Sequence, residues 1–110
     1  MNLSVLPEIN IIKSKNVIKD ILDNGTKIYT RFGIFFLKKN TEEKKYIAVL
    51  IKKSIGIAVK RNYYKRILRE YLRNNIDKFP DYNQIIFLFN GSGNATYADI
   101  KEEFGKKIKF

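Results

Sequence analysis

The sequence contains no cysteine and no histidine, and it has half as many acidic side chains as basic ones. Without cysteine, the chain can form neither a disulfide nor a thiolate metal site. Without histidine, it has no imidazole general base and no histidine-ligated metal. Carboxylates remain as candidate catalysts, but the 11 acidic residues are scattered along the chain. We therefore predict that the polypeptide alone has no catalytic residues and holds no metal.

The sequence also lacks a long apolar run, since none approaches the roughly 20 residues that span a bilayer. Its N-terminus lacks the basic and then apolar pattern of a signal peptide. A length of 110 residues with 45% hydrophobic content suits one domain with a single core. We expect a cytoplasmic protein with one domain over residues 1–110 and no membrane association. Residues 1–12 are weakly patterned and are expected to form an extended or frayed arm.

The positive charge is concentrated between Lys52 and Arg73. This segment holds 8 Lys or Arg and 1 acidic residue, so it carries +7 of the total +11. A solvated helix face is the ordinary explanation for such charge. That explanation is weakened here because like charges four residues apart repel one another on a helix. The charge therefore indicates a surface for a polyanion.

The same segment has the period of a helix. Its apolar residues recur at i, i+3, i+4, i+7 and i+8 and form one stripe, namely Tyr64, Ile67, Leu68, Tyr71 and Leu72. The cations lie away from this stripe. Gly56, just ahead, allows a tight turn into the helix. One side of the helix should therefore dock on a core while the other presents a rigid array of cations.

The rest of the chain predicts a small number of further elements. Ser14 can cap a first helix, which Gly25 ends in a left-handed conformation. A polar hairpin loop over 39–45 joins two strands, the second of them central in the sheet. A later apolar strand is expected to lie parallel to a neighbour, and Thr96 caps the last helix. The predicted elements are helices over 14–24 and 96–108 and strands over 28–38, 46–53 and 84–89.

The basic segment contains an ungapped motif, Gly56-x-Ala58-Val59-x-Arg61-Asn62-x-x-Lys65-Arg66-x-x-Arg69-Glu70. This spacing resembles the signature of the bacterial ribonuclease P protein subunit, whose basic helix has an Arg-Asn-Arg core. Tyr63 stands where the family has the second Arg of that core. Lys52-Lys53-Ser54 stands where the family usually has Ser-Lys-Lys. The resemblance runs from about Lys13 to Ile108, nearly the whole chain.

The resemblance implies a fold. It implies an α+β two-layer sandwich (α/β in the broad sense) with the element order αβββαβα, like the second domain of a ribosomal protein. The sheet is mixed and includes a left-handed βαβ crossover, against the usual right-handed rule. It also implies a third strand where the residues themselves indicate only two before the basic helix.

The resemblance further implies a function in tRNA maturation. Ribonuclease P removes the 5′ leader of precursor tRNA, and its RNA subunit carries the active site and the Mg²⁺ that activates water. The expected partners are this RNA and precursor tRNA, and no DNA is expected. The residues expected to bind RNA are Lys52, Lys53, Lys60, Arg61, Asn62, Tyr63, Lys65, Arg66, Arg69 and Arg73. The leader cleft is assigned to Ile18, Leu22, Phe36 and Lys53, although the first three could equally be core residues.

Other functions remain open from the sequence. One is a noncatalytic RNA-binding module, similar to a ribosomal protein, with the same basic helix and no substrate cleft. Another is a DNA-binding regulator whose basic helix enters a major groove, commonly as a dimer. A helix lying on a membrane surface is weaker, because the adjoining strands need its apolar stripe.

Overall fold

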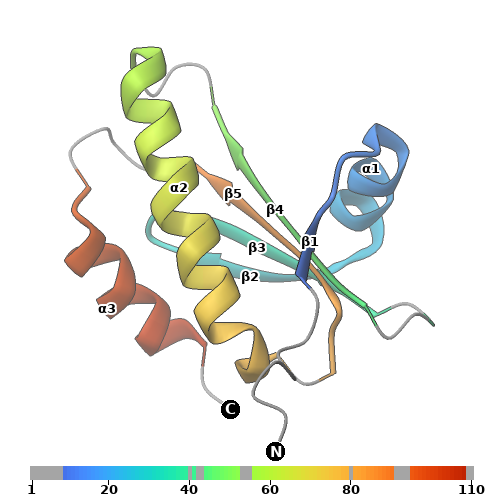
Figure 1. The fold of residues 1–110 in the computed structure, drawn as a ribbon. Coiled ribbons are helices and arrows are strands. Elements are labelled where there is room, and N and C mark those ends of the chain that lie inside the picture. The colour runs from blue at the N-terminus through green and yellow to red at the C-terminus, as the bar shows by residue number, and fades with distance from the viewer. Residues whose placement is uncertain are drawn as a thin grey trace, which may run out of the picture.

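The computed structural model describes residues 9–39, 41, 44–52, 56–79, 81–90 and 95–108. Five strands, three α-helices and one short 3₁₀ helix follow one another in this part of the chain (Figure 1). In order they are β1 (Ile9–Ile11), α1 (Lys15–Asn24), β2 (Thr26–Thr30), β3 (Gly33–Lys38), β4 (Lys45–Ile51), α2 (Ala58–Asn75), η1 (Ile76–Lys78), β5 (Gln84–Phe89) and α3 (Tyr97–Lys107).

The strands form one mixed sheet in the order β1-β4-β5-β3-β2. The β1–β4 and β4–β5 pairs are parallel, while β5–β3 and β3–β2 are antiparallel. The two parallel neighbours β4 and β5 are joined by α2 in a left-handed crossover (Figure 1). The expected order αβββαβα is confirmed, with β1 added ahead of it.

Helices lie on both faces of the sheet (Figure 1). α2 and α3 cover one face, where they bury a large core with inward side chains such as Phe35, Phe87 and Phe104. α1 packs on the other face, where a smaller cluster gathers around Ile21 and Ile86. Successive strand residues point to opposite faces, so Phe35 and Phe36 belong to different clusters.

The basic helix α2 is held by its apolar stripe, as predicted. Its buried residues are the five members of the stripe, Tyr64, Ile67, Leu68, Tyr71 and Leu72. Gly56, with φ of 103°, lies in the region that favours glycine, so the predicted tight turn before the helix is confirmed. Because one side of α2 is fixed to the core, the backbone position of every basic residue on its other side is fixed as well.

One prediction at the N-terminal end is narrowed and another is corrected. The arm predicted over residues 1–12 as extended or frayed is extended and not frayed at residues 9–12, because Ile9–Ile11 pair with β4 and Ile12 is buried. Residues 1–8 lie outside the described residues. Ser14 does cap α1, accepting a hydrogen bond from the Val17 amide. Gly25, however, is extended and not left-handed, with φ of −74° and ψ of 159°. Its small size is still needed, since a Cβ there would lie 2.5 Å from the Ile21 carbonyl oxygen.

The single strand predicted over 28–38 is wrong, because the structure has a hairpin there. β2 and β3 pair around Arg31 and Phe32. The Thr30 hydroxyl donates to the Gly33 carbonyl at 2.8 Å and accepts from the Gly33 amide at 3.1 Å. The loop predicted over 39–45 does not close a hairpin either, since β5 lies between β3 and β4. Residues 40, 42 and 43 of that loop lie outside the described residues.

The remaining predictions of elements hold, except that β4 ends at Ile51, ahead of the end predicted for the strand over 46–53. β4 lies between β1 and β5, so it is a central strand. β5 covers residues 84–89 and lies parallel to β4. The Thr96 side chain accepts a hydrogen bond from the Asp99 amide at 3.2 Å and caps α3.

Candidate nucleic-acid interface

The exposed side of α2 forms a shallow groove of about 340 Å³. We call this the cationic groove, and its lining residues are Asn62, Lys65, Arg66, Arg69 and Arg73. These residues recur every three or four positions, so they stack along one side of the helix. All five were predicted from the sequence to bind RNA, and the structure brings them together.

Among the described residues, no carboxylate lines the cationic groove. Lys65, Arg66, Arg69 and Arg73 form no ion pair within the described part of the chain, where Lys38–Asp20 and Lys106–Glu102 pair elsewhere. Arg69 is partly buried, and its Nε atom is buried without a hydrogen-bond partner among the described residues. A buried donor without a partner is unfavourable, so Arg69 Nε is a cost to the folded chain, and only the rest of this guanidinium can face the groove.

Tyr63, the position that departs from the family motif, lies beside Arg66. The Cζ atom of Arg66 is 5.6 Å from the centre of the Tyr63 ring, which is the geometry of a cation–π contact. The Tyr63 ring meets the Tyr64 ring edge-on at 5.4 Å. Tyr64 in turn stacks on Phe89 at 4.5 Å and donates its hydroxyl proton to the Ala95 carbonyl at 2.8 Å. Burial raises the pKa of Tyr64, which keeps that hydroxyl protonated.

The other predicted RNA-binding residues lie outside the groove lining. Arg61 donates from Nη1 to the Gly56 carbonyl at 2.5 Å, so its side chain turns back to the start of the helix. Lys60 is exposed in the first turn of α2, and Lys52 is exposed just after β4. Lys53 lies outside the described residues.

The described residues assigned to the leader cleft meet on the α1 face of the sheet, opposite to the face that α2 covers. Ile18 and Leu22 from α1 pack in the same cluster as Phe36 from β3. Phe36 is only 6% exposed, so it is mainly a core residue. This is the second of the two roles that the sequence left open for Phe36. Ile18 and Leu22 are half-buried and form the accessible part of this wall. The Lys27 ammonium lies 5.8 Å from the centre of the Phe36 ring and places a positive charge there.

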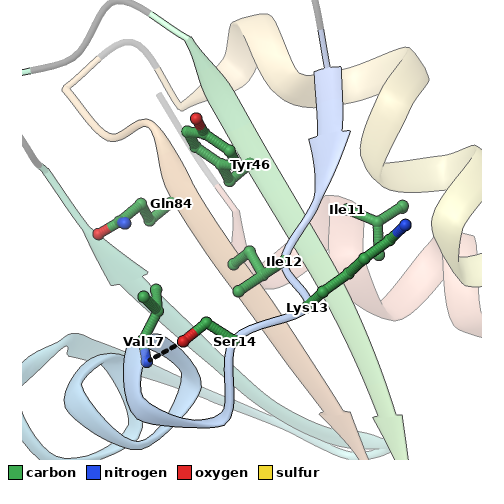
Figure 2. A pocket seen from close by; sticks show the side chains of 7 residues that line it. All are labelled: Ile11, Ile12, Lys13, Ser14, Val17, Tyr46 and Gln84. Atoms are coloured by element: carbon green, nitrogen blue, oxygen red, sulfur yellow. Dashed lines mark hydrogen bonds between the residues drawn. The ribbon is translucent and has the colours of Figure 1, made fainter.

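A second cavity, of about 270 Å³, lies between the end of β1 and the start of α1, where the sequence pattern predicts no site (Figure 2). It is lined by Ile11, Ile12, Lys13, Ser14, Val17, Tyr46 and Gln84. One signal could have indicated it, because Gln84 is the only polar residue of an otherwise apolar buried strand.

Two features are absent from the described part of the chain. No three His, Cys, Asp or Glu side chains there are grouped so that they could hold a metal ion. None of the helices there combines the length and the apolarity needed to traverse a bilayer.

A mixed α+β sheet with a left-handed crossover and a cationic groove along one helix defines a class of small basic proteins suited to binding RNA. The family model described as Ribonuclease P matches residues 6–109. The chain therefore belongs to the ribonuclease P family of protein components.

Two relatives, both named Ribonuclease P protein component, agree with this assignment. The one from Fusobacterium nucleatum is 30% identical over 92 residues, which cover 84% of this chain and 83% of the relative. The one from Syntrophus aciditrophicus is 30% identical over 95 residues, which cover 86% of this chain and 80% of the relative.

Solved structures agree on the fold. The RNase P protein of Staphylococcus aureus has a TM-score of 0.78 at 21% identity, covering 89% of this chain and 91% of that one. The RNase P protein of Thermotoga maritima has a TM-score of 0.75 at 18% identity, covering 89% and 94%.

Proposed function

We propose that this chain is the protein subunit of a ribonuclease P holoenzyme. It binds the catalytic RNA through the cationic groove and contacts the 5′ leader of precursor tRNA on the α1 side of the sheet. In this way it assists the Mg²⁺-dependent removal of the leader, which gives the mature 5′ end of tRNA. The observation that carries the proposal is the row of cations on α2 that no described carboxylate neutralises.

The groove suits the phosphates of a folded RNA. The planar guanidinium groups of Arg66, Arg69 and Arg73 can each hold two phosphate oxygens, while Lys65 acts as a point charge. Asn62 both donates and accepts, so it suits a sugar or a base edge. Phosphate contacts position an RNA without reading its sequence, and they make the affinity fall steeply with salt.

The α1 side of the sheet suits a single strand. Ile18 and Leu22 offer an apolar surface for bases, while Lys52 near the end of β4 can follow the backbone. Lys53 was predicted to lie near the leader and is proposed here for the same role. The aliphatic side chains pack against bases but do not stack on them as aromatic rings would.

The chemistry is proposed to belong to the RNA. The RNA holds Mg²⁺, which activates the attacking water, and the described carboxylates of the chain are not grouped to hold a metal. The cations of the protein reduce the repulsion between the phosphates of the two RNAs. The holoenzyme should therefore need less Mg²⁺ than the catalytic RNA alone.

The alternative is a noncatalytic RNA-binding module with the same groove. Its RNA affinity would resemble that of a subunit, so binding alone does not separate the two. A DNA-binding regulator that acts as a dimer and a helix that lies on a membrane surface have less support. The whole apolar stripe of α2 is buried in the core, so it is available neither to a membrane nor to a dimer partner.

The groove assignment can be tested with Arg66→Ala and Arg69→Ala. Each variant should bind a bacterial ribonuclease P RNA about 10- to 100-fold more weakly, since a charge-assisted contact contributes about 1.5–3 kcal/mol. The slope of log affinity against log salt should become shallower by about 1 in each. Filter binding over a salt series measures both quantities.

Arg31→Ala is the matched control, because Arg31 is an exposed arginine in the β2–β3 turn, outside the groove. It should leave the affinity for the RNA nearly unchanged. Normal affinity in both groove variants, with the fold intact by circular dichroism, would contradict the assignment of the groove.

A further inference from the structure

The first turn of α2 lacks several contacts that usually hold the start of a helix. Ile57, the N-cap residue, has no side-chain oxygen and makes no capping hydrogen bond. The first turn also contains no acidic residue that would interact favourably with the helix dipole. The buried residues of α2 begin only at Tyr64, so residues 58–63 are not held by the core. Another contact must therefore keep this turn in place.

The side chain of Arg61 makes a contact across the first turn. Its Nη1 atom donates to the Gly56 carbonyl oxygen at 2.5 Å, while its backbone amide donates to the Ile57 carbonyl oxygen at 3.2 Å. Gly56 is the residue with φ of 103° at which the chain turns into the helix. The guanidinium thus connects the end of the first turn to the residue that precedes the helix.

The charge of Arg61 is unfavourable at this place in the helix. A cation near a helix N-terminus is repelled by the positive end of the dipole, and Arg61 also lies four residues ahead of the cation Lys65. The side chain of Arg61 is half-buried and does not belong to the lining of the cationic groove. The hydrogen bond to Gly56 explains an arginine here better than the groove does.

We propose that Arg61 is a positioning residue, which holds the first turn of α2 in place for RNA and does not itself hold a phosphate. The residue that depends on Arg61 is Asn62, which follows it directly and lines the N-terminal end of the cationic groove. If this turn frayed in the free chain, RNA binding would have to order it, and the affinity would fall. A turn that is already ordered avoids that loss.

The inference rests on the proposed RNA-binding function and changes the role of Arg61, which the resemblance placed among the residues that contact RNA. The two roles differ in their salt dependence. Loss of a phosphate contact makes the slope of log affinity against log salt shallower by about 1. Loss of order in the free chain weakens binding by the same factor at every salt concentration, because the phosphate contacts of the complex are unchanged.

Arg61→Ala and Lys65→Ala separate these roles in filter binding to a bacterial ribonuclease P RNA over a salt series. Arg61→Ala should bind about 2- to 10-fold more weakly, as expected for the loss of one hydrogen bond, with an unchanged slope. Lys65→Ala removes a cation of the groove, so its slope should become shallower by about 1. The midpoint of thermal unfolding should stay the same in Arg61→Ala, because the buried stripe begins at Tyr64.

A substitution at Ile57 provides a rescue. Ile57 is 69% exposed and has the extended conformation of an N-cap, so Ile57→Ser should add a capping hydroxyl without disturbing the core. In the Arg61→Ala background, Ile57→Ser should restore the affinity for RNA to within about twofold of the native chain. In the Lys65→Ala background it should restore nothing, because a cap does not replace a cation. Alone, it should leave the affinity unchanged.

Hydrogen exchange of the free chain tests the same contact without RNA. The backbone amides of Asn62 and Tyr63 bond to carbonyl groups of the first turn. In Arg61→Ala these amides should exchange about 2- to 10-fold faster, and Ile57→Ser should reverse the change. In Lys65→Ala they should exchange at the native rate.

Three results would overturn the proposal. One is normal RNA affinity in Arg61→Ala, and another is unchanged exchange of the Asn62 and Tyr63 amides in that variant. The third is a slope shallower by about 1 that Ile57→Ser does not rescue, which would show that Arg61 holds a phosphate directly. If exchange and RNA binding respond as expected but the holoenzyme releases no leader, the proposed function fails and the role of Arg61 stands.

Discussion

The ring of Tyr63 lies between the core and the cationic groove. On its inner side it contacts Tyr64, which stacking and a hydrogen bond hold in place. On its outer side it lies under the guanidinium of Arg66. An arginine at this position would add one charge to the groove. The tyrosine instead restricts Arg66, which lowers the entropy that Arg66 loses when it binds a phosphate.

Two substitutions of Tyr63 separate these roles. Tyr63→Arg restores the family motif and should keep or raise the affinity for ribonuclease P RNA, with a salt slope steeper by about 1. Tyr63→Ala removes the contact with Arg66, which at an exposed site contributes about 0.5–1 kcal/mol, so affinity should fall a few-fold. Filter binding at several salt concentrations tests both. A large loss in Tyr63→Arg would show that the ring itself contacts RNA.

At the residue scale, helical spacing predicted the buried stripe of α2 and the position of the cations away from it. The five residues of the cationic groove were among the ten that the resemblance to the family implied. It could not predict the contact between Tyr63 and Arg66, because spacing does not give side-chain rotamers. The hydrophobic pattern predicted Gln84 as the first residue of an apolar strand, because one polar residue among six does not change that pattern.

The β2–β3 hairpin is the element that the sequence pattern did not predict. Its turn, Arg31-Phe32, contains none of the Gly, Asn, Asp or Pro residues that usually indicate a turn. The Thr30 hydroxyl closes the turn in their place. The sequence pattern did not predict β1 either, because three residues are too few to show a periodic pattern. Pairing with β4 holds these residues in the extended conformation.

Two glycines give opposite predictions about stability. A Cβ on Gly33 would lie 2.0 Å from the Leu88 carbonyl oxygen, and backbone cannot move aside, so Gly33→Ala should lower the free energy of unfolding by about 1–3 kcal/mol or more. Gly105 lies in α3 with open space around it, so Gly105→Ala should raise that free energy by about 0.5–1 kcal/mol. Urea denaturation measures both. Equal stability of the two variants would contradict the close packing of β3 on β5.

The ion pair between Asp20 and Lys38 connects α1 to the sheet. The hydrogen bond from Lys38, with a second from Asn24, lowers the pKa of Asp20 below its ordinary value. Its contribution to stability is therefore present above the unfolded pKa of about 3.9 and is lost as the pH falls through the folded pKa. Lys38→Met should raise the pKa of Asp20 in a carboxyl titration by nuclear magnetic resonance. An unchanged pKa would show that the pair does not persist in solution.

At the scale of the whole molecule, the sheet separates two surfaces. α2 presents its cations from one face, while α1, with Ile18 and Leu22, covers the other. The left-handed crossover through α2 produces this arrangement. General rules favour the opposite hand, so the residues alone could not predict it, and only the resemblance to the family indicated it. The proposed function assigns one RNA segment to each of these two surfaces.

The most direct test of the proposed function is a reconstitution at low Mg²⁺. The purified chain is mixed with a bacterial ribonuclease P RNA and a precursor tRNA, and release of the 5′ leader is followed. We predict cleavage at the mature 5′ end only when both the chain and the RNA are present, with reduced rates for Arg66→Ala and Arg69→Ala. Tight RNA binding without any stimulation of cleavage would contradict this account and favour a noncatalytic RNA-binding module.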